Sequence, residues 1–468
     1  MDPSEREVAD NRALLTDLYE LTMAAAYFAA GMTAPATFSF FVRAYPKDRG
    51  YLVAAGQEDV LRHLETFRFS RDALRYLRRS AMYHADFLDY LEQLRFSGDV
   101  WGLPEGSLCF VPEPLIEVTA PIIEAQIVET YVINQLNLQT LIATKAARCV
   151  HAARGRDLVD FSLRRTHGTD AGMKVARASY LAGFAGSSNV LAEKHYGIPA
   201  FGTMAHSYVE SFDDEIDAFR AFARLFPTNS TLLVDTYDTL SGVRKAAEVA
   251  KEMAARGQQL SGVRLDSGDL LALSQGARAI LDAAGLPAVR IFASGGLNEY
   301  KVAELVERGA PIDAFGIGTD MGVSGDAPWL DCAYKLVEYA GLPRLKLSPA
   351  KQTLVGRKQV WRGVGADGQM IGDVLALRDE AGAVMAAQLG VGLDQVQPRL
   401  VPVMRAGRRL DPLPGLDAIR ARCRAELAAL PEAHQALRQP AAYPVRVSVE
   451  LESRQTAATA AVRARLAR

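Results

Sequence analysis

The chain has 468 residues, which is more than one ordinary domain needs and indicates two or three domains, or one barrel with additions. Hydrophobic residues make up 49% of the chain and charged residues 23%, so a large buried core is available. The formal net charge of -2 argues against a dedicated nucleic-acid-binding protein, which would need a basic face.

The four cysteines are far apart in the sequence, and they form neither a CxxC pair nor a cluster with histidines. This spacing argues against a disulfide framework and against a structural zinc site. The N-terminal residues are polar and charged and lack the apolar core of a signal peptide, and no run of about 18 apolar residues occurs. We therefore expect a cytoplasmic protein with no membrane-spanning segment.

Residues 1–140 predict an N-terminal α/β domain. The segment "LLTDLYELTMAAAYFAAG" has helical apolar spacing and a stop at Gly31, and "ATFSFFVRAYP" alternates like a strand that ends at Pro46. Residues 57–95 read as helices, and "GDVWGLPEGSLCFVPEPLIEVTAP" reads as a small β-rich unit. A long helical stretch over residues 122–155 leads into the next domain.

Residues 141–334 show a different pattern, in which short apolar runs end in polar turns and helix-like segments follow. The runs are "DLVDFSLRR", "IPAFGTMAHS", "TLLVDTYDT", "SGVRLDSGD", "VRIFASGG" and "IDAFGIGTD". Asp235, Asp266, Ser294 and Thr319 end the last four runs and are 31, 28 and 25 residues apart, the length of one strand–loop–helix unit. Six such units predict a parallel α/β domain that is barrel-like, whether regular or irregular. An open doubly wound sheet is the alternative.

The remainder of the chain carries no such units. Residues 335–400 read as strands and turns, which we expect to join the N-terminal α/β domain. Residues 401–468 are rich in Ala, Arg and Leu and predict a helical C-terminal extension without a chemical motif.

The polar residues after the apolar runs should face one shared cavity, because ligands of barrels and open α/β sheets bind beyond the carboxyl ends of the strands. These residues are Phe161, Arg164, Arg165, Thr203, His206, Asp235, Asp238, Arg264, Asp266, Ser267, Asp269, Ser294, Gly295, Gly296, Asn298, Gly316, Gly318 and Thr319. Arginines and glycine-rich turns suit anions, whereas carboxylates suit a divalent cation or a sugar hydroxyl.

Two consecutive glycine-rich turns, "ASGGLNE" and "GIGTD", favour a phosphate site. Glycines allow close backbone approach, and the free N–H groups of each turn and of the following helix attract an anion. The alternative is that the glycines serve only tight turns. Two such turns in tandem after apolar runs favour phosphate binding.

Arg264 and Asp266 are two residues apart, so both point to the same side of their strand, and we interpret them as functional. Asp269 we interpret as the cap of the next helix. His206 follows a predicted strand end, and a neighbouring parallel strand would bring Asp235 close enough to orient its imidazole ring. His167 is the competing histidine. The chain has no GxxxxGK[ST], GxGxxG or HExxH motif.

Several ordered blocks of the chain are similar to nicotinate phosphoribosyltransferases, and together they cover most of residues 11–360. The blocks are "LLTDLYELTMA", "FFVRAYPKDRGYLVAAG", "DFSLRRTHG", "GFAGSSNVLAEKHYGIPAFGTMAHSYV", "LLVDTYDT", "GVRLDSGDL", "GIGTD" and "YKLVEYAGLPRLKLSPAKQTLVG". The resemblance implies transfer of the phosphoribosyl group of 5-phosphoribosyl-1-pyrophosphate (PRPP) to nicotinate, which yields nicotinate mononucleotide and pyrophosphate in NAD salvage. It also implies Mg²⁺, coupling to ATP hydrolysis through a phosphohistidine, and a homodimer with shared active sites.

The resemblance also implies roles for single residues. His206 would accept the phosphoryl group, with Asp235 as its partner. Tyr19 and Phe161 would sandwich the pyridine ring, with Tyr19 supplied by the other subunit. Thr203, Arg164 or Arg165, and Arg264 would hold the nicotinate carboxylate or the PRPP phosphates, and Asp266 would meet the ribose or its metal. The residues expected to hold the 5-phosphate come from the two glycine-rich turns: Ser294, Gly295, Gly316, Gly318 and Thr319. The metal ligands themselves are not assigned.

Two alternative functions remain open at this point. A nicotinamide or quinolinate phosphoribosyltransferase would differ in the charges near the ring, and the second arginine of "SLRR" favours nicotinate. A non-catalytic phosphosugar-binding barrel would not need His206 beside Asp235, Arg264 and Asp266.

Overall fold

The structure, a computed structural model, describes residues 7–8, 10–348, 353–410 and 414–467. Contacts between Cα atoms divide the chain into two compact units. Unit 1 comprises Met1–Thr140 and Trp329–Arg468, and unit 2 comprises Leu141–Pro328. Residues 349–352 of the "LKLSPAKQTLVG" block lie outside the described residues.

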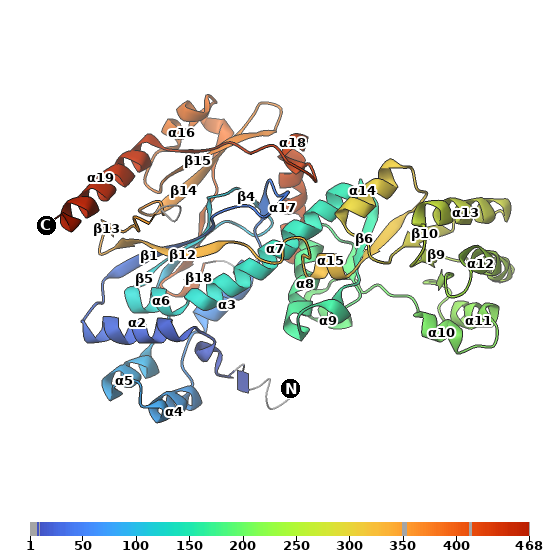
Figure 1. Ribbon diagram of the computed structural model, residues 1–468, viewed down its shortest axis with the longest axis horizontal. Helices are drawn as coiled ribbons and strands as arrows, with labels where there is room; N and C mark the ends of the chain where they lie inside the picture. The colour runs from blue at the N-terminus through green and yellow to red at the C-terminus, as the bar shows by residue number, and fades with distance from the viewer. Residues whose placement is uncertain (1–6, 9, 349–352, 411–413, 468) are drawn as a thin grey trace. The chain divides into compact units, whose positions relative to one another are not determined.

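Unit 1 contains a large antiparallel sheet of seven strands among its described residues. The strand order is β13 (Leu342–Pro343), β12 (Cys332–Tyr339), β1 (Pro35–Val42), β5 (Pro114–Pro121), β3 (Asp99–Gly102), β17 (Val401–Arg405) and β18 (Arg408–Arg409). Strand β1 lies between β12 and β5 and is buried from Ala36 to Val42, which explains its nearly continuous apolar sequence. Strands from both ends of the chain therefore share one sheet (Figure 1).

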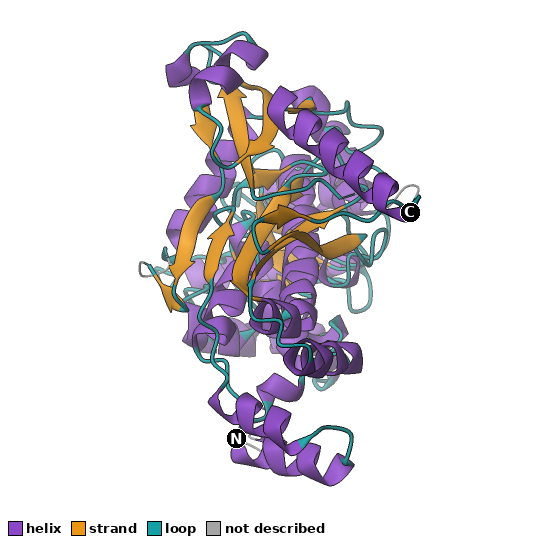
Figure 2. Cartoon of the chain, turned by 90° about the vertical axis from the view of Figure 1, so that its left-hand side faces the viewer, coloured by secondary structure: helices purple, strands orange, loops and turns teal. Residues whose placement is uncertain are grey.

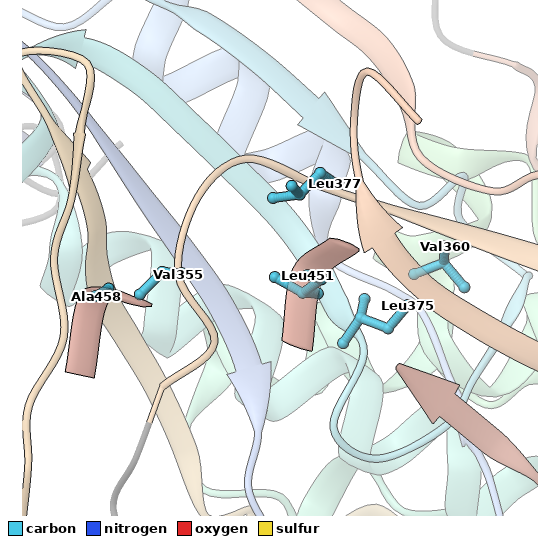
Figure 3. Close-up of a cluster of buried hydrophobic side chains, with 6 residues drawn as sticks. All are labelled: Val355, Val360, Leu375, Leu377, Leu451 and Ala458. Carbon is cyan, nitrogen blue, oxygen red and sulfur yellow. The ribbon is translucent and has the colours of Figure 1, made fainter. Parts of the chain in front are cut away.

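A second, four-stranded sheet in unit 1 has the order β16 (Val396–Pro398), β14 (Lys358–Val364), β15 (Met370–Leu377) and β19 (Val445–Val447). The last helix, α19 (Val449–Leu466), packs against β15, and Figure 2 shows it as the long helix that ends at the C-terminus. The packing is apolar, and Figure 3 shows the six buried side chains that form it: Val355, Val360, Leu375, Leu377, Leu451 and Ala458. This cluster fixes the C-terminal helix to the body of unit 1.

The segment predicted as a helical extension, residues 401–468, is therefore part of unit 1. It contains the helices α17 (Leu416–Ala429), α18 (Glu432–Gln435) and α19, and it also supplies strands β17, β18 and β19. Short strands such as these depend on pairing with distant partners, which the local sequence does not reveal.

The other elements of unit 1 are mostly helices around these sheets. They are α2 (Leu18–Ala29), α3 (Gln57–Glu65), α4 (Arg71–Ser80), α5 (Ala85–Gln93), α6 (Ile122–Ile127), α16 (Gly382–Leu389), the 3₁₀ helices Arg12–Leu14 and Leu393–Gln395, and the pair β2 (Leu52–Val53) and β4 (Leu108–Cys109). The long helix α7 (Glu129–Ala153) runs from unit 1 into unit 2.

Unit 2 is built on a parallel sheet of six strands. The strand order is β7 (Gly186–Ser187), β6 (Asp157–Asp160), β11 (Ala314–Ile317), β10 (Arg290–Ala293), β9 (Gly262–Leu265) and β8 (Thr231–Leu233). The strand–loop–helix units predicted from the sequence are confirmed for β6, β8, β9, β10 and β11. Unit 2 also contains the helices α8 (Thr169–Leu181), α9 (Val190–Tyr196), α10 (His206–Glu210), α11 (Glu215–Leu225), α12 (Thr239–Ala254), α13 (Leu270–Ala283), α14 (Glu299–Glu307) and α15 (Thr319–Gly322).

Two expectations for unit 2 differ from the structure. The α/β class and the parallel sheet are confirmed, but the predicted barrel-like form is not shown. Strands β7 and β8 lie at the two ends of the sheet and do not pair with each other among the described residues. The prediction of a strand in "IPAFGTMAHS" is wrong. This segment makes only one isolated β-bridge, from Ala200 to Ser187, and Ser187 belongs to the short strand β7. The residues after Phe201 are small or polar, so they lack the alternating apolar side chains that would pack a strand into the sheet.

None of the helices in the described part of the chain has the length and apolar character that crossing a membrane requires.

Candidate active site

A cavity of about 460 Å³ lies at the carboxyl ends of the strands of unit 2. The residues that line it are Phe161, Arg164, Ser188, Gly202, Thr203, Met204, Ala205, His206, Leu233, Arg264 and Asp266. Phe161 follows β6, Leu233 ends β8, and Asp266 directly follows β9. The structure thus brings together six of the predicted site residues: Phe161, Arg164, Thr203, His206, Arg264 and Asp266.

His206 is the first residue of α10, and its side chain is 39% exposed in the cavity. Its Nδ1 atom lies 3.2 Å from the hydroxyl oxygen of Thr236. Its Nε2 atom lies 4.0 Å from Oδ1 of Asp235 and 3.9 Å from Oδ2 of Asp266. The imidazole ring therefore has a hydroxyl on one side and two carboxylates on the other.

Asp235 lies two residues beyond the end of β8, and its side chain is 1% exposed. Its Oδ2 atom accepts hydrogen bonds from the backbone N–H of Asp266 at 3.1 Å and from the hydroxyl of Ser267 at 2.6 Å. Its Oδ1 atom has no hydrogen-bond partner among the described residues and is the atom nearest His206. A buried oxygen without a partner is unusual, so this atom is available for a ligand or for a protonated histidine.

Arg264 organises the centre of the cavity through its guanidinium group. It donates to the hydroxyls of Ser294 at 2.8 Å and Thr203 at 3.2 Å, and to Oδ1 of Asp266 at 2.8 Å. Ser294 in turn donates to the same Asp266 oxygen at 2.5 Å. Because the guanidinium is planar and bonded on several edges, its orientation in the cavity is fixed.

The ring of Phe161 lies beside this guanidinium, whose central carbon is 5.0 Å from the ring centroid. Gly316, on the neighbouring strand β11, makes room for the ring, because a Cβ there would come within 2.6 Å of Phe161 Cδ2. An aromatic face next to a held cation is the arrangement that a planar anionic ring requires.

The two glycine-rich turns follow β10 and β11. Gly295 has a φ of +93°, and a Cβ on it would lie only 1.8 Å from the carbonyl oxygen of Asp266. Ser294 is buried, whereas Thr319, the first residue of α15, is exposed. The structure therefore gives Gly295 and Gly316 a packing role, and the predicted role of both turns in phosphate binding stays a prediction.

Three further residues can now be placed. Arg164 lines the cavity, whereas Arg165, which belongs to the same short 3₁₀ helix (Leu163–Arg165), is not among the described lining residues. His167 is exposed in the turn before α8 and is likewise not among them. Asp269 caps α13 by accepting hydrogen bonds from the backbone N–H groups of residues 271 and 272, as the sequence predicts.

Tyr19 belongs to unit 1, where it lies on α2 and is 45% exposed. Partial burial of Tyr19 and the nearby carboxylate of Glu129 raise the pKa of this tyrosine above its usual value. The predicted contact of Tyr19 with a pyridine ring stays a prediction.

The described residues offer no metal site made by the protein alone. No group of three or more His, Cys, Asp or Glu among the described residues is arranged to hold a metal ion. Asp235 and Asp266 offer two carboxylates, and Mg²⁺ commonly binds through one or two carboxylates together with substrate phosphates and water. The residues present therefore fit a Mg²⁺ held mainly by substrate oxygens.

Besides the lining residues Ser188, Gly202, Met204, Ala205 and Leu233, two polar residues that support the site, Thr236 and Asp160, were not predicted from the sequence. Thr236 lies between residues that the strand-end argument considered, but beyond a strand end the alternation of side chains no longer shows which one turns inward. Asp160 is buried at the end of β6 and accepts hydrogen bonds from the backbone N–H and hydroxyl of Ser162 and from the hydroxyl of Ser187. Burial raises the pKa of Asp160, and its bonds fix the loop that carries Phe161 and Arg164.

Comparison with known proteins gives consistent matches along the chain. Residues 14–137 match the nicotinate phosphoribosyltransferase (NAPRTase) N-terminal domain, residues 157–338 match the NAPRTase family, and residues 357–455 match the nicotinate phosphoribosyltransferase C-terminal domain. The chain is 51% identical over 438 residues to nicotinate phosphoribosyltransferase pncB2 of Mycobacterium tuberculosis, an alignment that covers 93% of this chain and 91% of the relative.

Two further relatives agree with these matches. The chain is 41% identical over 380 residues to nicotinate phosphoribosyltransferase of Bacillus subtilis, with 79% of this chain and 77% of the relative covered. The crystal structure of human nicotinic acid phosphoribosyltransferase superposes with a TM-score of 0.83 at 32% identity, and the match covers 94% of this chain and 99% of the human chain.

Proposed function

The chain belongs to the nicotinate phosphoribosyltransferase family, and from this premise we propose how the cavity of unit 2 performs the reaction. The reaction transfers the 5-phosphoribosyl group of PRPP to nicotinate and releases pyrophosphate, a step of NAD biosynthesis. The observation that supports our assignment of the site most directly is the placement of Phe161, Arg264 and His206 around one cavity.

We assign the nicotinate ring to the face of Phe161 and its carboxylate to the arginines. Arg264 is held by three neighbouring side chains, so it presents a fixed cation beside the ring, and Arg164 supplies a second cation from the adjacent loop. Thr203 and Asp266 complete this part of the cavity, with Asp266 directed at the ribose hydroxyls. Tyr19 from the partner subunit covers the other face of the ring in this proposal.

The bond changes involve only the two substrates. The pyridine nitrogen forms a bond to C1 of the ribose while the bond from C1 to the pyrophosphate oxygen breaks, and the electron pair leaves with pyrophosphate. Mg²⁺, when bound to the substrate phosphates, stabilises the charge on the departing pyrophosphate. The protein aligns the ring nitrogen with C1 and holds the 5-phosphate at Ser294, Gly295, Gly316, Gly318 and Thr319.

His206 is the residue that we propose accepts the γ-phosphoryl group of ATP. In this step the imidazole nitrogen forms a bond to phosphorus as ADP leaves, and water later releases the phosphate. Thr236 and the two carboxylates of Asp235 and Asp266 orient the ring. Asp235 also offsets the positive charge that the ring gains, because its Oδ1 atom is buried and has no other hydrogen-bond partner in the described part of the chain.

The central experiment measures product formation with nicotinate, nicotinamide and quinolinate, each with PRPP and Mg²⁺, in the presence and absence of ATP. We expect nicotinate mononucleotide as the main product and stimulation by ATP. Product from nicotinamide or quinolinate instead would support the alternative base, and PRPP binding without any product would support a non-catalytic binding protein.

We propose that the protein is a cytoplasmic homodimer. A second experiment tests the homodimer. Mixed Tyr19→Ala and Arg264→Ala variants should recover part of the activity, because one of the two sites in a mixed dimer combines an intact Tyr19 with an intact Arg264. No recovery after confirmed subunit exchange would show that Tyr19 acts within its own chain or not at all.

A further inference from the structure

The ammonium group of Lys145, near the middle of α7, is fully buried in unit 2 among three carboxylates. Its Nζ atom lies 2.6 Å from Glu299, 2.7 Å from Asp326 and 3.6 Å from Asp320. Glu299 is also fully buried, and Asp320 and Asp326 are about one third exposed. A buried lysine with this many carboxylate neighbours retains its charge, and its ion pairs raise the pKa of Lys145 despite its burial.

Two of these carboxylates belong to the two glycine-rich turns, and the third, Asp326, follows α15. Glu299 is the first residue of α14, directly after the turn of residues 294–298, and Asp320 is the second residue of α15, after Gly318 and Thr319. One ammonium group therefore joins the turn after β10 to the turn after β11. Arg148, one turn further along α7, also binds Glu299, with its Nε atom 3.1 Å from Oε1.

This arrangement solves an electrostatic conflict at the turns. An acidic residue in the first turn of a helix interacts favourably with the helix dipole, but it repels a phosphate that uses the same N–H groups. Lys145 and Arg148 compensate Glu299, and Lys145 also lies near Asp320. Two cations thus face the three carboxylates Glu299, Asp320 and Asp326, which offsets most of the negative charge that would repel a dianionic phosphate from the N–H groups of the turns.

We propose that Lys145 is a positioning residue for PRPP, which fixes the two glycine-rich turns relative to each other and offsets part of the negative charge of the carboxylates beside it. This inference rests on the proposed function and adds to it a residue that contacts no substrate. Both turns also touch the proposed nicotinate residues, since Ser294 binds Arg264 and Gly316 packs on Phe161. In our assignment the 5-phosphate lies on the turns themselves, so we expect the larger effect on PRPP.

The test compares the variants Lys145→Met and Lys145→Arg with the wild-type enzyme in steady-state kinetics. We expect Lys145→Met to raise the KM for PRPP on the order of tenfold or more, since it leaves a buried carboxylate without its main partner. The KM for nicotinate should change less than about twofold. Lys145→Arg, which keeps the charge, should recover much of the PRPP affinity.

The matched control is Lys245→Met. Lys245 also bridges two carboxylates in unit 2, Asp214 at 3.1 Å and Glu215 at 3.4 Å, but it contacts neither glycine-rich turn. This variant should leave both KM values unchanged. The double variant Lys145→Met/Glu299→Gln removes both partners of the buried pair, so it replaces the single variant if that variant does not fold. Its KM for PRPP should still exceed that of the wild type.

The outcomes are separable. Wild-type enzyme that forms no nicotinate mononucleotide would overturn the proposed function. A second outcome would overturn only this inference. If the wild-type enzyme is active, and Lys145→Met (or the double variant in its place) loses thermal stability but keeps its KM for PRPP, then Lys145 is purely structural.

Discussion

The central carbon of the Arg264 guanidinium group lies 5.0 Å from the centroid of the Phe161 ring. The three nitrogens of this group donate hydrogen bonds to Ser294, Thr203 and Asp266. We expect Arg264→Lys to lower kcat/KM for nicotinate on the order of a hundredfold, because an ammonium group keeps the charge but not this fork of donors. Steady-state kinetics measures the loss. Arg278→Lys, a change on the outer helix α13, is the control and should stay within about twofold of wild type.

Arg164 and Arg165 form a natural pair for comparison, because they are adjacent and only Arg164 is among the residues that line the cavity. Arg164→Ala should raise the KM of nicotinate or PRPP roughly tenfold, since a cation beside the substrate anions is lost. Arg165→Ala should leave both values near wild type. A larger effect from Arg165→Ala than from Arg164→Ala would reverse the assignment of the two side chains.

The backbone at Gly295 gives a prediction that does not depend on substrate contacts. Gly295→Ala places a Cβ 1.8 Å from the carbonyl oxygen of Asp266 at a φ of +93°, so the turn must move away from β9. We expect a clear drop in the melting temperature and at least a tenfold loss of activity. Gly285→Ala is the control, because Gly285 also has a positive φ, +75°, but no atom lies within 4 Å of a Cβ there. Equal effects of the two changes would mean that only the backbone angle matters.

His206→Ala tests the phosphoryl-transfer step. With ATP labelled at the γ-phosphate, wild-type enzyme should acquire a protein-bound label that is stable in base and released in acid. The variant should lose both this label and the stimulation of product formation by ATP. His167→Ala, which changes the competing histidine outside the cavity, should retain both, and a variant lacking His206 that still carries the label would refute our assignment.

His63 in unit 1 makes stability depend on pH. The ring is buried and stacks on Tyr131 with centroids 3.8 Å apart, and burial, together with the nearby Arg12, lowers the pKa of His63 to about 3. Between this value and the ordinary pKa of about 6.5, the unfolded chain binds a proton that the folded chain does not, so stability falls as the pH falls through that window. The contribution is about 1.4 kcal/mol per pH unit within the window, and it is absent above it.

His63→Phe keeps the aromatic stack and removes this titration. Unfolding midpoints measured at about pH 5 and about pH 7 should differ less for the variant than for wild type. The same difference in both proteins would show that His63 carries no part of the acid sensitivity.

The sequence predicted the strand ends at β6, β8, β9, β10 and β11 well, because these apolar runs stop at polar residues, and Arg264 and Asp266 do share a site. The sequence also predicted that His206 belongs to the site, but it placed this residue at the end of a full strand. In the structure His206 begins a short helix after an irregular segment. Whether the parallel sheet closes into a barrel, and how β17 and β19 join their sheets, depends on pairing between residues far apart in the chain, which local patterns do not encode. Thr236 was missed because it lies where strand alternation has ended.

The discontinuous build of unit 1 has a consequence for how the protein is made. Unit 2 is one continuous stretch of chain, so its parallel sheet can form while synthesis is still under way. The large sheet of unit 1 needs β12 beside β1 and β17 beside β3, and the small sheet needs β19 beside β15. The N-terminal half of unit 1 therefore cannot complete its sheets until the last strands have been synthesised. Its apolar faces stay exposed until the chain leaves the ribosome, so chaperone binding during synthesis should concentrate on residues 1–140.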